Sequence, residues 1–236
     1  MLKAELLQNF ILISEFAPDK RMRVLKRNPH VLKLLLALAI VTHVSNVAAR
    51  AQVVIQEKPA NLAARFGRLH RGINLSHWFS QAPNYSKTHL ETHTTAQDIA
   101  LIKAMGFDHV RFPIEPAPLL SETPDPSILN SGYIQYIDNA LDMILAAGLA
   151  VIVDIHPSDE FKLRINREER AIEAFAKFWR AFATHLAKRN PDFVFLEVLN
   201  EPMVEDGYRW YGIQGKLIAA IRLGAPNHTI IACGHR

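Results

Sequence analysis

Two patterns of apolar residues alternate along this chain. Short, almost wholly apolar runs such as LAVIVDIHP (149–157) alternate with longer stretches, such as 132–148, in which apolar residues recur every three or four positions. The first pattern predicts strands buried on both faces, and the second predicts helices with one apolar side. The expected strands cover 68–78, 107–114, 149–157, 192–202 and 228–234, and the expected helices cover 94–106, 132–148, 167–189 and 208–224.

The connections between these elements differ on the two sides of the predicted sheet. Each helix leads almost directly into the next strand, whereas longer polar segments follow the strands at 76–93, 115–131 and 157–166. Parallel α/β folds carry their ligand-binding groups at the carboxyl ends of the strands. Because the long loops lie on that side only, we expect a (β/α)8 TIM barrel.

The first four predicted strands end in side chains that are able to do chemistry. These groups include a carboxylic acid, a guanidinium, an imidazole and a primary amide. Such a set suits cleavage of an acetal, since one group can protonate the leaving oxygen while others bind hydroxyls. The residues are Asn74, His77, Arg111, Asp154, His156, Asn200 and Glu201. If Glu201 points into the barrel mouth, alternation along the strand predicts that Leu199 and Glu197 share its side at greater depth.

Five stretches carry a resemblance to a known family. They are RGINLSHW, GFDHVRFPI, VIVDIHP, LEVLNEP and HTIIACGHR, and the resemblance covers the chain from about Arg68 to the last residue. In order and spacing the chain resembles glycoside hydrolase family five, the cellulase-type barrel enzymes. The resemblance implies retaining hydrolysis of O-glycosidic bonds in β-linked polysaccharides or oligosaccharides, as in endoglucanases, with no cofactor.

The resemblance also implies roles for individual residues. Glu201 matches the general acid/base, and Asn200 matches the amide that binds the 2-hydroxyl near the reacting carbon. Arg111 matches the arginine that holds the nucleophilic carboxylate ionised, and His156 matches a histidine of the substrate cleft. Asn74 and His77 lie at the end of the first strand and are predicted to bind substrate with them.

Each of these roles has a structural alternative. Glu201 could cap a turn, and His156 could be a hydrogen-bonded core histidine. Arg111 could be a salt-bridge partner of the two acids Asp154 and Glu197, which we expect to be deep structural groups.

Trp78 is the remaining predicted substrate-binding residue, and its alternatives are equally open. Its indole could stack on the apolar face of a sugar ring, as aromatic side chains can. Tryptophan is also a common anchor for loops, so both interpretations stand at the level of the sequence.

The resemblance covers only five strands. A barrel of this type needs eight strands and typically about 250 residues. The family's nucleophilic glutamate lies on a later strand, and no acidic residue follows Glu205 and Asp206. We therefore expect an incomplete barrel truncated after about strand five, a fragment that shows no glycosidase turnover alone. The alternative is an inactive half-barrel or carbohydrate-binding remnant, and the DNA downstream of Arg236 would distinguish the two.

Charge is concentrated at the amino-terminal end. Residues 1–50 hold eight Lys/Arg and three Asp/Glu, whereas the remainder holds 19 basic and 20 acidic residues. The near-neutral remainder shows no basic patch for nucleic acid.

The basic end has the layout of a secretory signal peptide. A cationic segment begins at Met22, an apolar run follows at 34–41, and a small-x-small site lies at 49–51. We expect a leader over 1–51, a glycoside hydrolase domain over 52–236, and a secreted or periplasmic protein. The apolar run is short for a stable membrane span; an uncleaved anchor or a surface helix are the alternatives. N-terminal sequencing tests the hypothesis that Met22 is the true start.

The cysteine and histidine content argues against an internal disulfide and against a metal site. Cys233 is the single cysteine, so no internal disulfide can form, and its apolar surroundings predict an inert thiol. The eleven histidines show no HExxH or similar spacing, so we expect no metal site.

Overall fold

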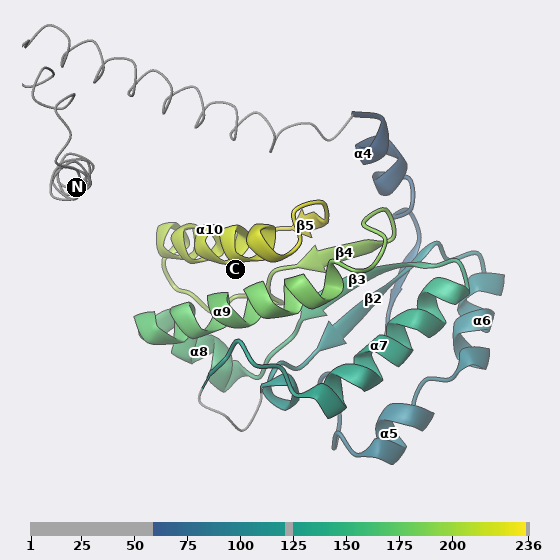
Figure 1. Ribbon diagram of the computed structural model, residues 1–236, viewed down its shortest axis with the longest axis horizontal. Coiled ribbons are helices and arrows are strands. Elements are labelled where there is room, and N and C mark those ends of the chain that lie inside the picture. Colours follow the sequence, from purple (N-terminus) through teal and green to yellow (C-terminus); the bar gives the residue numbers. More distant parts are fainter. Residues whose placement is uncertain (1–58, 121–124, 235–236) are drawn as a thin grey trace, which may run out of the picture. The chain divides into compact units, whose positions relative to one another are not determined.

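The computed structural model describes residues 59–120 and 125–234, so the predicted leader at 1–51 lies outside the described residues. Strands and helices alternate as the sequence predicts (Figure 1). The strands are β1 Gly72–Asn74, β2 His109–Ile114, β3 Ala150–Ile155, β4 Val194–Glu197 and β5 Thr229–Ile231. The helices are α4 Pro59–Phe66, α5 Lys87–Thr92, α6 Ala96–Ala104, η1 Ala117–Leu119 (a 3-10 turn), α7 Ser131–Ala146, α8 Asp159–Arg167, α9 Glu169–Leu186 and α10 Gly207–Gly224.

The five strands form one open, wholly parallel sheet in the order β1-β2-β3-β4-β5. In this order each strand pairs with its neighbour in the sequence, and a helix follows each of the first four strands, as in successive units of a barrel wall. Helix α7 contacts β3, and α9 packs along α10 (Figure 1). The described part is therefore an incomplete (β/α) barrel, as expected.

The two faces of the sheet differ in chemistry. Val110 and Phe112 of β2 are fully buried in the hydrophobic core beneath the helices. Arg111 lies between them and faces the opposite side, because alternate residues of a strand point to opposite faces. Register places Asn74 beside Arg111, and Asp154 lies beside both Pro113 and Glu197. We call the side that carries Asn74, Arg111, Asp154 and Glu197 the polar face.

Two glycines allow close approaches that any larger residue would block. A Cβ on Gly72 would lie 2.1 Å from Nε2 of His109, so the imidazole of β2 crosses the start of β1. A Cβ on Gly224 would lie 2.5 Å from the carbonyl oxygen of Arg180, which lets the end of α10 touch the backbone of α9.

Two helices occupy segments that the sequence predicted as loops. Helix α5 lies within 76–93 and buries only Leu90, and α8 fills most of 157–166. Both begin at a serine whose hydroxyl accepts an N–H bond three residues on, Ser86 from His89 and Ser158 from Phe161. Both helices are short, with six and nine residues, and carry few apolar side chains, so the apolar pattern of the sequence did not reveal them.

The strands are shorter than predicted. Strand β4 ends at Glu197 rather than at 202, and β1 holds three residues of the expected 68–78. Asn200 and Glu201 therefore belong to the loop after β4 and not to the strand tip. Among the described residues, no helix is long and apolar enough to cross a membrane.

Candidate active site

Arg111 is the centre of a charged network on the polar face. Its Nε and Nη2 donate to the two carboxylate oxygens of Glu197 at 2.8 and 2.7 Å, and Nη2 lies 2.8 Å from Oδ2 of Asp154. The side chain of Asp154 is completely buried, so an unpaired charge there would be strongly destabilising. Burial alone would lower the pKa of Arg111, but Glu197 and Asp154 outweigh it and raise that pKa. The salt-bridge alternative for Arg111 is confirmed.

Asn200 and His156 complete this network. Nη2 of Arg111 donates to Oδ1 of Asn200 at 3.0 Å, and Nδ2 of Asn200 lies 3.1 Å from Nε2 of His156. Nδ1 of His156 lies 3.0 Å from Oδ2 of Asp154. The backbone N–H of Asn200 donates to the carbonyl of Ile155, which ties the loop after β4 to the end of β3. Three predicted site residues, Arg111, His156 and Asn200, thus lie in direct contact.

The two residues predicted at the end of β1 have different surroundings. Oδ1 of Asn74 accepts from Nη1 of Arg111 at 3.2 Å, so Asn74 belongs to the network. His77 has a φ of 61°, and its Nδ1 lies 3.0 Å from the carbonyl oxygen of Gln81 in its own loop. His77 therefore shapes the loop after β1.

Trp78 corrects one prediction. Its side chain is only 2% exposed, and its indole N–H donates to the carbonyl of Leu90 at 2.9 Å. The ring packs edge-on against Phe79 with centroids 5.0 Å apart, and lies 5.4 Å from the ring of Phe112. No face of the indole is open to a sugar ring, so the stacking interpretation was wrong and the loop anchor describes this residue.

Glu201 adopts a backbone conformation that is uncommon for a residue with a side chain. Its φ is 42°, and strain of this kind clusters at functional sites. The turn comes after β4 has ended, so the predicted alternation of Glu201, Leu199 and Glu197 along one side does not apply. The residue is exposed and lines a pocket of about 420 Å³.

This pocket joins the loop after β4 to helix α8. Lys162 and Asn166 of α8 line it opposite residues 201–205. The side chain of Lys162 is only 6% exposed, and its ammonium lies 3.5 Å from Oδ1 of Asp159. An ammonium and an amide in a pocket of this size can donate hydrogen bonds to a polar, uncharged ligand.

Lys162 and Glu115 were not among the predicted site residues. Glu115 directly follows β2, and burial raises its pKa, while hydrogen bonds from the backbone of Ala117 and Ser158 act against that shift. Its place after a buried strand was a signal in the sequence, because the other polar groups share it. Lys162 gave no such signal, since its helix was not predicted.

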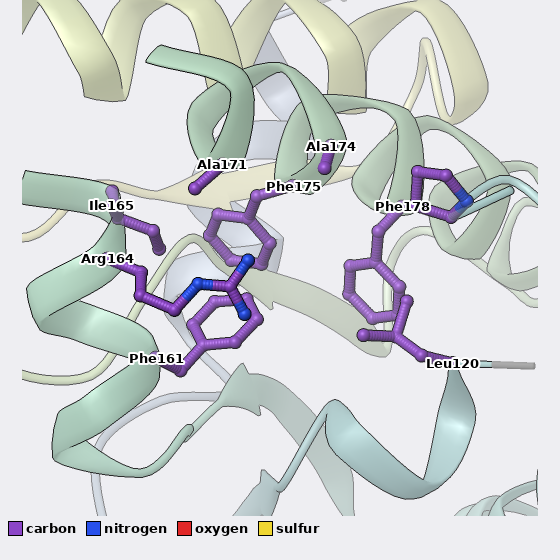
Figure 2. A pocket seen from close by; sticks show the side chains of 9 residues that line it. Leu120, Phe161, Arg164, Ile165, Ala171, Ala174, Phe175 and Phe178 are labelled. Carbon is purple, nitrogen blue, oxygen red and sulfur yellow. The ribbon is translucent and has the colours of Figure 1, made fainter. Parts of the chain in front are cut away.

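A second, apolar pocket lies away from this chemistry. Its volume is about 100 Å³, and Phe161, Phe175 and Phe178 line it with Arg164 (Figure 2). Phe161 and Phe175 pack edge-on with centroids 5.2 Å apart. The pocket is a gap in the packing between α8, α9 and the segment that holds Leu120 and Pro126. Within the described ranges, no group of three His, Cys, Asp or Glu side chains could hold a metal ion.

Comparisons with known proteins agree with this geometry. Residues 70–236 match the family model described as cellulase (glycosyl hydrolase family 5). Endoglucanase C of Acetivibrio thermocellus is 30% identical over 157 residues, which are 64% of this chain and 45% of that protein. Cellodextrinase A of Ruminococcus flavefaciens is 30% identical over 170 residues, 68% of this chain and 49% of that protein.

A solved structure shows the same fold. Cel5A of Thermotoga maritima, solved in complex with cellobiose, superposes with a TM-score of 0.63 at 28% identity. The match covers 73% of this chain and 54% of that one. The chain spans about half the length of the curated relatives named above. Because the family model extends over most of the sequence and over all five strands, this chain belongs to glycosyl hydrolase family 5, the cellulase family.

Proposed function

We propose that this chain supplies the general acid/base of a retaining endoglucanase-type enzyme that hydrolyses β-linked glucans or their oligosaccharides. The observation that carries the proposal is the pair Asn200–Glu201. The amide of Asn200 is held by Arg111 and His156, and the next residue opens into a pocket that can hold a sugar.

In the first step, the carboxylic acid of Glu201 gives its proton to the glycosidic oxygen as the bond to the anomeric carbon breaks. A carboxylate on the opposite side of the sugar attacks the anomeric carbon and forms a covalent glycosyl-enzyme. In the second step, Glu201 removes a proton from the water that attacks this intermediate. The exposure of Glu201 supports proton exchange with solvent.

We assign no nucleophile among the described residues. In retaining enzymes the two carboxyl groups lie about 5–5.5 Å apart. The side chain of Asp154 is completely buried, and both carboxylate oxygens of Glu197 are bound by Arg111, so neither acid presents a free oxygen to an anomeric carbon. Their contribution is to hold the guanidinium in place, while its Nη1 binds Asn74 and its Nη2, which contacts both acids, also binds Asn200.

The pocket beside Glu201 would receive the sugar unit next to the bond that is broken. Its volume of about 420 Å³ lies in the usual range for small-molecule sites, roughly 300–1,000 Å³. Lys162 and Asn166 would donate hydrogen bonds to the hydroxyls of this sugar.

The test uses Glu201→Gln, which keeps the shape of the side chain but cannot transfer a proton. Since the chain spans about half of its relatives, residues 70–236 replace the matching part of Endoglucanase C in a chimera. We expect kcat on a cello-oligosaccharide to fall about 10²–10⁴-fold. An aryl cellobioside with a strongly acidic phenol should lose much less in its first step, because its leaving group needs no proton.

Glu173→Gln is the matched control, because Glu173 is an exposed glutamate of α9 that does not line the pocket. It should leave kcat within a few-fold of the parent chimera. Equal losses in the two variants, or a Glu201→Gln chimera that cleaves the oligosaccharide at the parent rate, would overturn the assignment.

A further inference from the structure

We infer that Asp154 holds His156 in the Nδ1–H tautomer and thereby orients the side-chain amide of Asn200. Asp154 is then a positioning residue, two hydrogen bonds away from Asn200. The importance of this orientation for catalysis rests on the proposed function. The tautomer itself follows from the geometry of the described residues alone.

The argument begins at Arg111, because a guanidinium can only donate hydrogen bonds. Nη2 of Arg111 lies 3.0 Å from one end of the Asn200 amide, so that end is the carbonyl oxygen. Glu197 holds the guanidinium by two further bonds, which prevents it from turning away. The amide nitrogen of Asn200 is consequently the end that faces His156.

An amide nitrogen also only donates, and this decides the state of His156. Nδ2 of Asn200 lies 3.1 Å from Nε2 of the imidazole, so Nε2 must offer its lone pair. In the neutral ring the proton then lies on Nδ1, 3.0 Å from Oδ2 of Asp154. The same Oδ2 lies 2.8 Å from Nη2 of Arg111, so the four side chains form a closed ring.

Only one arrangement of protons suits the whole ring. A hydrogen on Nε2 would face the N–H of Asn200, and two donors would oppose each other. Rotating the amide by half a turn would only move this conflict to Arg111. Asp154 of β3 is the acid that contacts the imidazole, and Glu115, which directly follows β2, lies close enough for the charge of His156 to lower the pKa of Glu115.

The ring leaves a defined part of Asn200 for a ligand. One N–H of Nδ2 goes to His156 and one lone pair of Oδ1 goes to Arg111. Among the described residues nothing binds the second N–H or the second lone pair, and their directions are set because the amide cannot turn. A ligand hydroxyl beside Glu201 would therefore meet the second N–H and the Oδ1 of Asn200 as a donor and an acceptor in fixed positions.

The experiment is long-range ¹H–¹⁵N correlation NMR of the 236-residue chain at pH 7.5. The histidines are ¹⁵N-labelled, and His156→Gln assigns the signals. We expect a pyridine-type shift for Nε2 and a pyrrole-type shift for Nδ1 of His156. An Nε2–H tautomer or an imidazolium in the unmodified chain would overturn the inference, whether or not any variant folds.

Two variants then test the role of Asp154. Asp154→Ala removes both carboxylate oxygens and with them the acceptor of the Nδ1–H, and we expect at least half of the Nδ1–H population to convert to Nε2–H. Ser80→Ala is the matched control, because Ser80 bonds only the backbone carbonyl of His156. Pure Nδ1–H in Asp154→Ala, or the same conversion in Ser80→Ala, would contradict control by Asp154. If Glu201→Gln leaves the activity of the chimera unchanged while His156 shows the Nδ1–H tautomer, only the proposed function is refuted.

Discussion

At the scale of single residues, the polar face shows how a buried charge is held. Asp154 lies within an otherwise apolar strand, and its side chain is fully buried. Burial raises the pKa of this carboxyl, while the hydrogen bond from His156 and the charge of Arg111 act against that shift. One oxygen, Oδ1, has no hydrogen-bond partner among the described residues. Burial of the Asp154 carboxyl is therefore energetically unfavourable. The proposed role of Asp154 in orienting His156 accounts for an acid at this position.

Cys233 permits a simple test at this scale. Burial raises the pKa of its thiol to about 11, and its Sγ lies 2.6 Å from the carbonyl oxygen of Leu199. At pH 8 only about one thiol in a thousand would be the reactive thiolate. We expect iodoacetamide to label the folded chain very slowly at pH 8, and the urea-unfolded chain rapidly. Complete labelling of the folded protein within minutes would contradict the burial.

At the scale of secondary structure, side-chain caps and ion pairs fix the helices. Thr95 and Asp98 form a capping box at the start of α6, and the side chain of Asn130 accepts two N–H bonds at the start of α7. Asp138 of α7 binds Nη2 of Arg189 at 2.8 Å and Nε2 of His185 at 2.9 Å, which joins α7 to the end of α9.

This link between α7 and α9 should depend on pH. Burial alone would raise the pKa of Asp138, but the bonds from Arg189 and His185 outweigh it and lower that pKa below 3.8. The stabilisation is therefore present above pH 4 and is lost as the pH falls through the lowered value. We expect Asp138→Asn to reduce the free energy of unfolding by about 1–2 kcal/mol at pH 7.

Urea unfolding at pH 7 and pH 3 measures this effect, and the difference between the variant and the parent should narrow at pH 3. Asp142→Asn is the matched control, because Asp142 binds the same Arg189 but its side chain is 69% exposed. Its cost should stay below about 0.5 kcal/mol. A difference that is the same at both pH values would contradict the role of the Asp138 carboxylate.

At the scale of the whole described structure, burial is greatest in the middle of the sheet. Strand β3 pairs on both sides and is nearly all buried, whereas β1 and β5 each have one neighbouring strand among the described residues. The residues of β1 are exposed and those of β5 are half-buried.

Hydrogen exchange should follow this order. Opening of an edge strand exposes little apolar surface, so it costs less free energy than opening the centre. We expect backbone amides of 151–155 to exchange at least about tenfold more slowly than those of β1 and β5. Native-state exchange followed by NMR measures the individual rates. Equal protection of β1 and β3 would contradict this picture of the sheet.

Much of the fold and part of the site could be predicted from the sequence. The order of strands and helices follows from periods of two and of about 3.6 residues, which are local properties of the chain. Parallel strands bring their carboxyl ends to one edge, so Arg111, His156 and Asn200 were expected to meet. The charged fork between Arg111 and Glu197 remained one alternative among several, because it joins residues 86 positions apart.

What the sequence alone determined was therefore the βα order and the kinds of polar group at the strand ends, since both depend on neighbours along the chain. Only the tertiary structure decided that Trp78 is an anchor, that Glu201 turns away from the line of its strand, and that Lys162 reaches the same pocket. These features depend on contacts between segments far apart in sequence. Burial and hydrogen-bond partners at such contacts, and not local preference, determine where each side chain points.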